Sequence, residues 1–114
     1  MIDANWVKEF VGAVTVCDAE GTSLDMNDRA ATTFAQRGGR ALIGSSVLDC
    51  HPEHARAKLA ELMATRQQNV YTIEKSGVKK LIYQSPWYRD GAYAGFVELS
   101  LVMPAEMPHF VRGA

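Results

Sequence analysis

Five runs along the chain have the pattern of β-strands, the first of them rich in β-branched residues, and turn-forming residues separate the first from the second and the last three from one another. The first two runs flank the turn Asp18-Ala19-Glu20-Gly21, where aspartate can hydrogen-bond to the following backbone and glycine tolerates a positive φ. The last three are joined by the short connections Ser76-Gly77 and Arg89-Asp90-Gly91-Ala92. The runs are residues 13–17, 22–26, 70–75, 78–88 and 93–103. They predict one hairpin and, later in the chain, an antiparallel meander.

Between the second and third runs the apolar residues take the three-to-four spacing of helices. Asn27 can cap a first helix that ends at Gly38-Gly39. The apolar face of that helix consists of Ala30, Ala31 and Phe34. A mixed loop precedes a second helix, in whose first turn Pro52 fits because its missing amide is not needed there. The buried stripe of the second helix consists of Ala55, Leu59, Leu62 and Met63, and the helix ends near Arg66.

Four apolar residues near the N-terminus recur at i, i+1, i+4 and i+5 before Gly12. They are Trp6, Val7, Phe10 and Val11. This spacing predicts a short amphipathic helix over residues 3–11. Its apolar stripe needs a surface to cover, which is either its own domain or a second copy of the chain, and in the second case these four residues form the dimer interface.

The order of elements is two strands, a block of helices and three strands, which predicts an α+β fold. We expect a five-stranded antiparallel sheet with helices across one face and an N-terminal flanking helix. Because the last two strands are apolar on both faces, both faces should be covered, one by the inserted helices and the other by the N-terminal helix. The expected divisions are a flanking helix over 1–12, one domain over 13–104 and a loose tail over 105–114.

Composition and charge narrow the class of function. The chain has 114 residues, enough for one domain with its own core. Its formal net charge of −1 provides no basic field for nucleic acid. No apolar run is long enough for a membrane span, and no secretory signal opens the chain. Cys17 and Cys50 form no CxxC pair and are expected to be reduced thiols in a cytoplasmic protein.

Sequence motifs of catalysis are missing as well. The chain contains no G-x-G-x-x-G, P-loop, H-E-x-x-H or G-x-S-x-G motif. Its serine, histidine and aspartate residues are plentiful but form no recognisable constellation. We therefore expect no enzymatic activity and assign no catalytic residue.

Several short motifs resemble, in their order and spacing, those of the PAS domain family, the small sensory and interaction modules of bacterial and eukaryotic signalling proteins. The resemblance covers about residues 11–103. It rests on the strand–turn–strand of residues 14–21, on Asn27 followed by Ala30, Ala31 and Phe34, on Leu42-Ile43-Gly44, and on the hairpin of residues 88–98. It implies a cavity between helices and sheet, which in some members holds heme, flavin or a metabolite. It also implies a homodimer formed through the N-terminal flanking helix, and a signalling effector domain or partner protein.

The function that the resemblance implies is the binding of a small ligand in that cavity by a sensory module. The candidate pocket residues are Phe34, Ile43, His51, Leu59, Met63, Tyr83, Ser85, Trp87 and Leu99. The alternative is a core filled by large side chains, in which case the chain is a ligand-free interaction and dimerisation module.

Polar residues within the apolar strands are ambiguous. Tyr83 and Ser85 share a strand face and would offer hydroxyls to a mostly apolar ligand if that face lined the cavity. Local packing is the alternative. Glu98 is either functional or paired with Lys79 or Lys80 across the sheet.

The segment over residues 49–54 carries the most suggestive chemistry. At 100° per residue, with Leu59 towards the core, His51 reaches the cavity edge and His54 points to water. Heme-binding PAS relatives take their proximal histidine from this stretch, so the resemblance implies His51 as a candidate ligand of heme iron. A local structural role for His51 is the alternative, and zinc is disfavoured because no second cluster supplies a fourth ligand. Flavin is not expected, because Cys50 stands in Asp-Cys-His rather than in the Asn-Cys-Arg core of light-oxygen-voltage photosensors.

Overall fold

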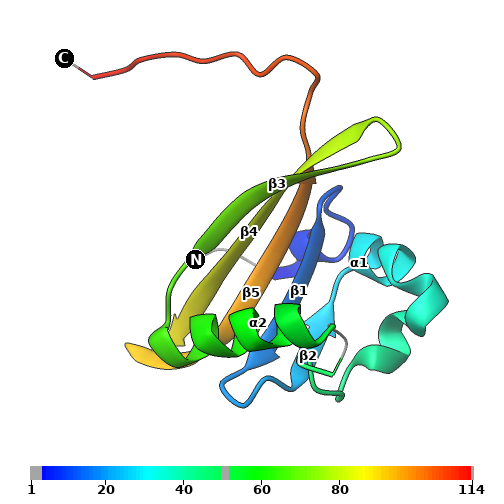
Figure 1. Ribbon diagram of the computed structural model, residues 1–114, viewed down its shortest axis with the longest axis vertical. Coiled ribbons are helices and arrows are strands. Elements are labelled where there is room, and N and C mark those ends of the chain that lie inside the picture. The colour runs from blue at the N-terminus through cyan, green and yellow to red at the C-terminus, as the bar shows by residue number, and fades with distance from the viewer. Residues whose placement is uncertain (1–3, 50–51, 114) are drawn as a thin grey trace.

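A five-stranded antiparallel sheet with the strand order β2-β1-β5-β4-β3 forms the centre of the structure (Figure 1). The strands are β1 (Ala13–Asp18), β2 (Ser23–Met26), β3 (Asn69–Lys75), β4 (Val78–Arg89) and β5 (Ala92–Val102). The computed structural model describes residues 4–49 and 52–113. The first two strands form a hairpin and the last three a meander, and β5 joins the two by pairing with both β1 and β4. The predicted α+β fold is confirmed.

The helical segments between β2 and β3 pack against the sheet. They are α1 (Asp28–Thr33), the 3₁₀ turns η2 (Ala35–Arg37) and η3 (Gly39–Leu42), and α2 (Glu53–Thr65). In Figure 1, α2 crosses in front of the sheet, while α1 and the 3₁₀ turns curve around its β1–β2 side. The predicted second helix is confirmed, since it follows Pro52 and ends at Arg66 in a left-handed conformation. No described helix is long and apolar enough to cross a membrane.

One core cluster fastens α2 to the sheet. Cys17 of β1 and Phe96 of β5 are register partners and pack against Leu62 and Met63 of α2. The side chains of Cys17 and Phe96 therefore define the inner face, which is the face of the sheet that carries the helices. Alternate residues of each strand share this face.

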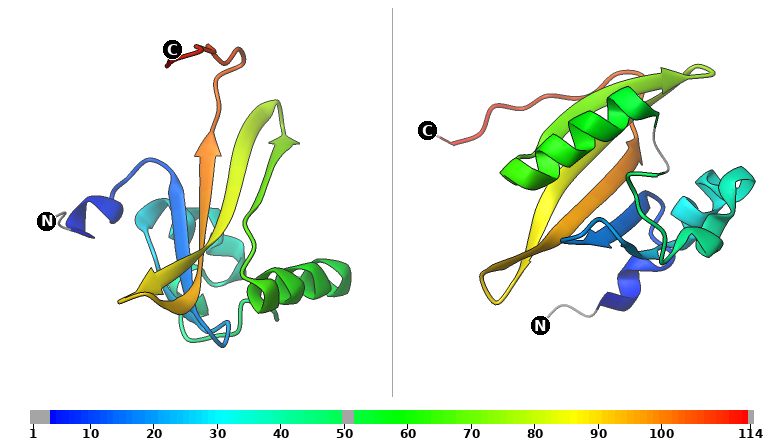
Figure 2. Two further views of the ribbon diagram at one scale, coloured as in Figure 1. Left: turned by 90° about the vertical axis from the view of Figure 1, so that its left-hand side faces the viewer. Right: turned by 60° about the horizontal axis from the view of Figure 1, so that its bottom comes forward.

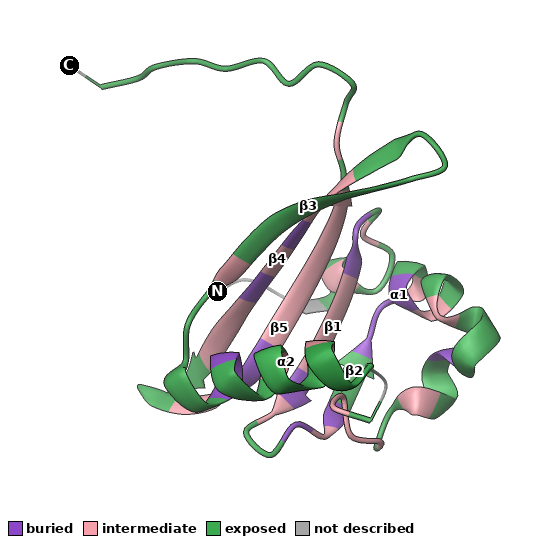
Figure 3. Cartoon of the chain, viewed as in Figure 1, coloured by how far each residue is buried: buried purple, intermediate pink, exposed green. Residues whose placement is uncertain are grey.

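A second core cluster fastens α1 to the same face at the opposite end of β1. It joins Ala13 and Met26 to Ala30, with Phe34 and Leu42 packed against it. In Figure 3, buried residues concentrate near α2 and at the start of α1, whereas β3 is exposed along most of its length. The helical layer therefore has two points of attachment, separated by the width of several side chains.

The other face of the sheet, the outer face, carries the remaining half of the strand residues. Val16 pairs with Val97, and Leu99 of β5 lies between Val14 and Tyr83. All five are only half-buried. Figure 2 shows the N-terminal segment on the opposite side of the sheet from α2, beside β1 and away from β3. The expected second cover is thus present only at one end.

The predicted N-terminal helix over residues 3–11 is wrong in form. The chain makes only a 3₁₀ turn, η1 (Ala4–Val7), and then an irregular stretch into β1. Trp6 is 56% exposed and Val11 is 78% exposed, although the Trp6 and Phe10 rings meet edge to face at 5.7 Å. An isolated α-helix this short is marginal in water, so contacts from the rest of the domain decide its conformation.

Those contacts come from Asn27, which is 3% exposed and caps α1. Its Oδ1 accepts hydrogen bonds from the amides of Val14 (3.0 Å) and Ala30 (3.1 Å). Its Nδ2 donates to the carbonyls of Val7, Phe10 and Gly12 at 3.0, 3.4 and 2.8 Å. One buried amide thus connects the N-terminal segment, β1 and α1. Because three carbonyls converge on it, the N-terminal segment curves around Asn27 rather than continuing as a helix.

Replacement of Asn27 should be costly. Asn27→Ala removes a helix cap and leaves several buried backbone groups without a partner, so we expect a loss of about 3 kcal/mol in the free energy of unfolding. Urea denaturation measures it, with Gln36→Ala at an exposed position as the matched control. A loss no larger than that of the control would contradict the role given to Asn27.

Candidate functional site

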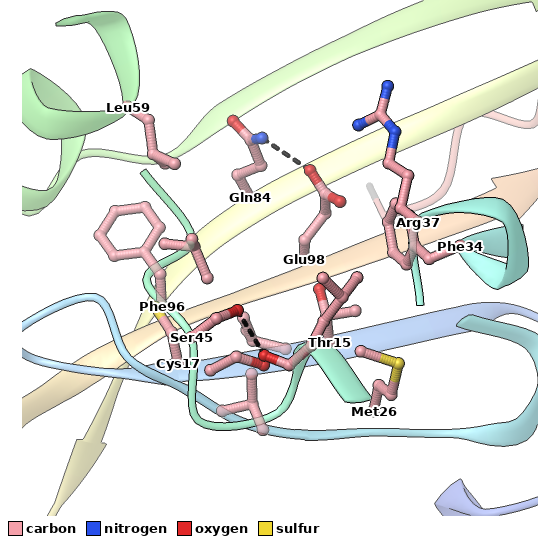
Figure 4. A pocket seen from close by; sticks show the side chains of 15 residues that line it. Thr15, Cys17, Met26, Phe34, Arg37, Ser45, Leu59, Gln84, Phe96 and Glu98 are labelled. Carbon is pink, nitrogen blue, oxygen red and sulfur yellow. Dashed lines mark hydrogen bonds between the residues drawn. The ribbon is translucent and has the colours of Figure 1, made fainter. Parts of the chain in front are cut away.

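A cavity of about 180 Å³ lies on the inner face, between the two core clusters. Its floor consists of Thr15 and Cys17 of β1, Gln84 of β4, and Phe96 and Glu98 of β5. Its walls include Phe34, Arg37 and Leu42 from the α1–η3 segment and Leu59 from α2. Figure 4 shows these side chains converging from opposite sides on the same space. The cavity exists because α1 and α2 attach to separate ends of the inner face and leave its middle uncovered.

A row of four polar residues crosses the inner face of the sheet, and three of them belong to the cavity floor. Thr15 pairs in register with Glu98, Glu98 with Gln84, and Gln84 with Asn69. The Asn69 Nδ2 donates to Gln84 Oε1 at 2.9 Å, and Gln84 Nε2 donates to Glu98 Oε1 at 2.7 Å. We call these four residues the polar row. It places a carboxylate, supported by two amides, at the bottom of the cavity.

The charge of Glu98 also acts on β3, two strands away in the sheet. Burial, and then the negative charge of Glu98, raise the pKa of the Tyr71 hydroxyl. Tyr71 lies on β3, two residues beyond Asn69 and therefore on the same face. The predicted pairing of Glu98 with Lys79 or Lys80 is not what the structure shows. Glu98 pairs instead with Gln84, because Gln84 is its direct neighbour on β4, whereas Lys80 is the neighbour of Val102.

The rest of the lining is mostly apolar. Besides the aromatic and leucine side chains, it includes Met26 and Val47. Ser45 sits at the rim, where its hydroxyl donates to the carbonyl of Leu42. Arg37 stands on the wall opposite Gln84, with Glu98 between them in Figure 4. The arrangement suits a small, largely apolar molecule with one polar group.

Cys17 is a buried thiol on the floor of the cavity, 4% exposed. Burial raises its pKa, an effect that a backbone hydrogen bond at Phe96 partly offsets and the charge of Asp18 reinforces. Since the thiolate is the reactive form, this environment makes Cys17 unreactive at neutral pH.

Two of the predicted pocket residues line the cavity and two lie near it. Phe34 and Leu59 are part of the lining. Met63 belongs instead to the core cluster beneath α2, where it packs with Cys17. Ile43 lies just outside, at a surface position after η3.

The predicted pocket residues on the strands face away from the cavity. Tyr83, Ser85 and Leu99 alternate with Gln84 and Glu98, so they lie on the outer face. This corrects the prediction that they line the cavity. The sequence could not decide between the faces, because both carry apolar residues in these strands.

Trp87 is outside the cavity lining as well. Its indole Nε1 donates to the carbonyl of Cys17 at 3.0 Å, across β5. Gly95 of β5 is the register partner of Trp87 and makes this crossing possible, since a Cβ there would collide with the Cys17 carbonyl oxygen. Trp87 therefore serves as a brace between β4 and β1.

The prediction of a heme ligand on the segment over residues 49–54 cannot be compared with the structure at its central residue. His51 and Cys50 lie outside the described residues. His54, in the first turn of α2, is exposed, as predicted. Within residues 4–49 and 52–113, no group of three or more His, Cys, Asp and Glu side chains could hold a metal ion.

Sequence reasoning missed Thr15, Gln84 and Arg37 as cavity residues. Two of the floor residues could have been found from the alternation of polar and apolar side chains along their strands. Gln84 and Glu98 are polar positions on one face of otherwise apolar strands, and a meander with a short turn brings them into register. No comparable signal marks Arg37, because a 3₁₀ turn has no fixed relation to the sheet.

The buried thiol yields a test of the cavity floor. In a Cys50→Ser background, alkylation of Cys17 by iodoacetamide should be slower in the folded protein than in urea. The pH at which the alkylation rate rises should also be higher for the folded protein than for the unfolded chain, because burial disfavours the thiolate. Mass spectrometry of timed samples measures both. Equal rates and equal pH midpoints in the two states would contradict the buried position.

Comparison with known proteins followed the geometry. No protein-family model and no curated protein matches the sequence. Among solved structures, a C-terminal domain from Streptococcus mutans has a TM-score of 0.68 at 16% identity and covers 84% of this chain and 78% of its own. The PAS domain of Bordetella pertussis BvgS has a TM-score of 0.63 at 18% identity (86% and 81% covered), and a sensory box sensor histidine kinase from Vibrio cholerae 0.59 at 11% (89% and 89%). The strand order, the one-sided helical layer and these similarities agree: the chain has the fold of a PAS domain.

Proposed function

We propose that this chain is a sensory module of signal transduction that binds a small molecule in the inner-face cavity and signals by association through its N-terminal segment. The observation that carries the proposal is the cavity itself, mostly apolar and floored by the polar row. The likeness of the fold to a sensor histidine kinase supports it. The proposal assigns no catalytic residue and no enzymatic reaction.

A route from the cavity to the N-terminal segment runs through Asp28. The Asp28 carboxylate pairs with Lys8 of the N-terminal segment at 3.2 Å and also with Arg40 of η3. The hydrogen bond from Arg40, and then the one from Lys8, lower the pKa of Asp28. The backbone amide of Asp28 donates to the Lys8 carbonyl at 3.0 Å. The segment that forms one cavity wall is thus tied to the N-terminal segment at Asp28, next to the connection that Asn27 makes.

This connection gives signalling a physical basis. η3 contributes Leu42 to the cavity wall and Arg40 to the Asp28 pair. A ligand that favours one position of η3 would therefore favour one position of the N-terminal segment, which is a population shift between two arrangements. The exposed ring of Trp6, packed edge to face on Phe10, is the surface whose presentation would change.

Two other functions that the sequence left open make different demands. A ligand-free interaction module requires a filled core. A heme sensor requires His51 at the iron, and an absorption spectrum with added hemin, beside His51→Ala, distinguishes it. A sharp Soret band lost in the variant would favour heme over a colourless ligand.

Filling the cavity should abolish ligand capture. Leu59 points into the cavity from α2, so Leu59→Trp occupies space that a ligand needs, while Ala60→Trp adds the same ring on the exposed side of the helix. We expect freshly purified wild-type protein and Ala60→Trp to release a small molecule on denaturation, and Leu59→Trp to release at least about tenfold less, since overpacking excludes it. Quantitative mass spectrometry of the released fraction measures this. The same yield from all three proteins would contradict the proposed site.

Loss of the Trp6–Phe10 aromatic pair should weaken association. Trp6→Ala combined with Phe10→Ala removes the exposed Trp6 ring and the half-buried Phe10 ring that packs on it, and we expect the dimer dissociation constant to rise at least about tenfold. Light scattering at micromolar concentrations reports the mass, with Phe110→Ala, an exposed aromatic on the C-terminal tail, as the control. An unchanged mass in the double variant would count against the N-terminal segment as the interface.

A further inference from the structure

The hydrogen bonds of the polar row run from Asn69 through Gln84 to Glu98, and their direction determines what the Glu98 carboxylate can still bind. An ionised carboxylate accepts hydrogen bonds and donates none, so Gln84 must present its NH₂ group to Glu98. The oxygen of Gln84 then faces Asn69, which donates to it. Every amide donor that points along the row is directed towards Glu98. What remains at the cavity end of the row is the acceptor capacity of the Glu98 carboxylate.

The apolar surroundings of Glu98 raise the cost of leaving its carboxylate without a hydrogen-bond donor. Phe34, Leu42 and Leu59 on the walls and Phe96 on the floor make the surroundings of Glu98 apolar. A molecule that fills the cavity removes water from the carboxylate, and a buried charge without a donor is costly. A ligand therefore binds well only if it brings a hydrogen-bond donor, and a protonated nitrogen brings both a donor and the opposite charge.

The volume sets the size of the rest of the ligand. An apolar cavity of about 150 Å³ is known to hold a benzene ring. The cavity of about 180 Å³ in this chain suits one ring or a short branched alkyl group, with a short arm towards Glu98. Aromatic rings on the wall and on the floor, Phe34 and Phe96, favour an aromatic or flat group.

We propose that the cavity selects a small, mostly apolar amine, whose protonated nitrogen binds the Glu98 carboxylate, the last acceptor of the hydrogen bonds that run from Asn69 through Gln84. This inference rests on the proposed function, because it names the class of ligand for the same cavity. Arg37 is the competing partner for Glu98, since it lines the cavity from the other wall and carries the opposite charge. If Arg37 neutralised Glu98 in the bound state, the cavity would favour neutral or carboxylate ligands instead.

Three compounds of one shape test the class of ligand. 2-Phenylethylamine, 2-phenylethanol and 3-phenylpropanoate share a phenyl ring and a two-carbon arm and differ in the charge and donor capacity of the end group. Each is titrated at pH 7 into the ¹⁵N-labelled full chain, and NMR shifts give both the affinity and the residues affected. We expect the amine to bind at least about tenfold more tightly than the alcohol, the magnitude of a charge-assisted hydrogen bond.

Variants assign the preference to residues. Glu98→Gln keeps the shape and the acceptor for Gln84 but removes the charge, so it should lower the affinity for the amine about tenfold and leave that for the alcohol within about threefold. Arg37→Gln should leave the affinity for the amine unchanged or raise it. A carboxylate that binds best in wild type and loses affinity in Arg37→Gln would overturn the amine class.

The outcomes separate this inference from the proposed function. If the alcohol or the carboxylate binds as well as the amine, and Leu59→Trp abolishes that binding, the cavity remains a ligand site and the amine class is wrong. If no probe shifts the amides of cavity residues, or if the shifts persist in Leu59→Trp, the amine class fails together with the cavity as a site for molecules of this size.

Discussion

The register of β5 between β1 and β4 is the constraint on which the rest of the structure depends. β5 is the central strand, and its pairing opposes Glu98 to Thr15 on one side and to Gln84 on the other. A shift of one residue would turn the side chain of Glu98 to the outer face and that of Val97 to the inner face. The same register opposes Phe96 to Cys17, where α2 attaches. Cavity floor, core and helix position thus follow from one alignment.

Asn27 provides the second constraint, because its hydrogen bonds join segments that are far apart in the sequence. Its amide group satisfies backbone groups from the N-terminal segment, β1 and α1, which a helix cap alone would not do. Asp28 next to it adds the charged contacts with Lys8 and Arg40. Two consecutive residues therefore join the N-terminal segment to the helical layer over the cavity. This proximity is the physical basis of the proposed coupling between the cavity and the N-terminal segment.

Local patterns in the sequence were sufficient for most of the fold. Turn residues such as Gly21 and Gly77 marked the hairpins, and the alternation within the strands gave the sets of residues that share a face. Alternation does not say which face is covered when both are apolar, and for that reason Tyr83 and Leu99 were assigned to the cavity. The N-terminal segment failed for a related reason: helical spacing is a weak guide in a segment whose conformation is decided by Asn27, a residue far along the chain.

The sequence by itself determined the α+β class, the hairpin and meander, the helix that follows Pro52, and the cap at Asn27, because each depends on residues close together in the chain. Only the tertiary structure decided that Glu98, Gln84 and Asn69 form one row, that Arg37 stands opposite, and that the outer face is covered only at one end. Those outcomes depend on strand register and on where α1 and α2 attach, which are set by packing between distant segments. The candidate site therefore emerged from the assembled sheet and not from any motif.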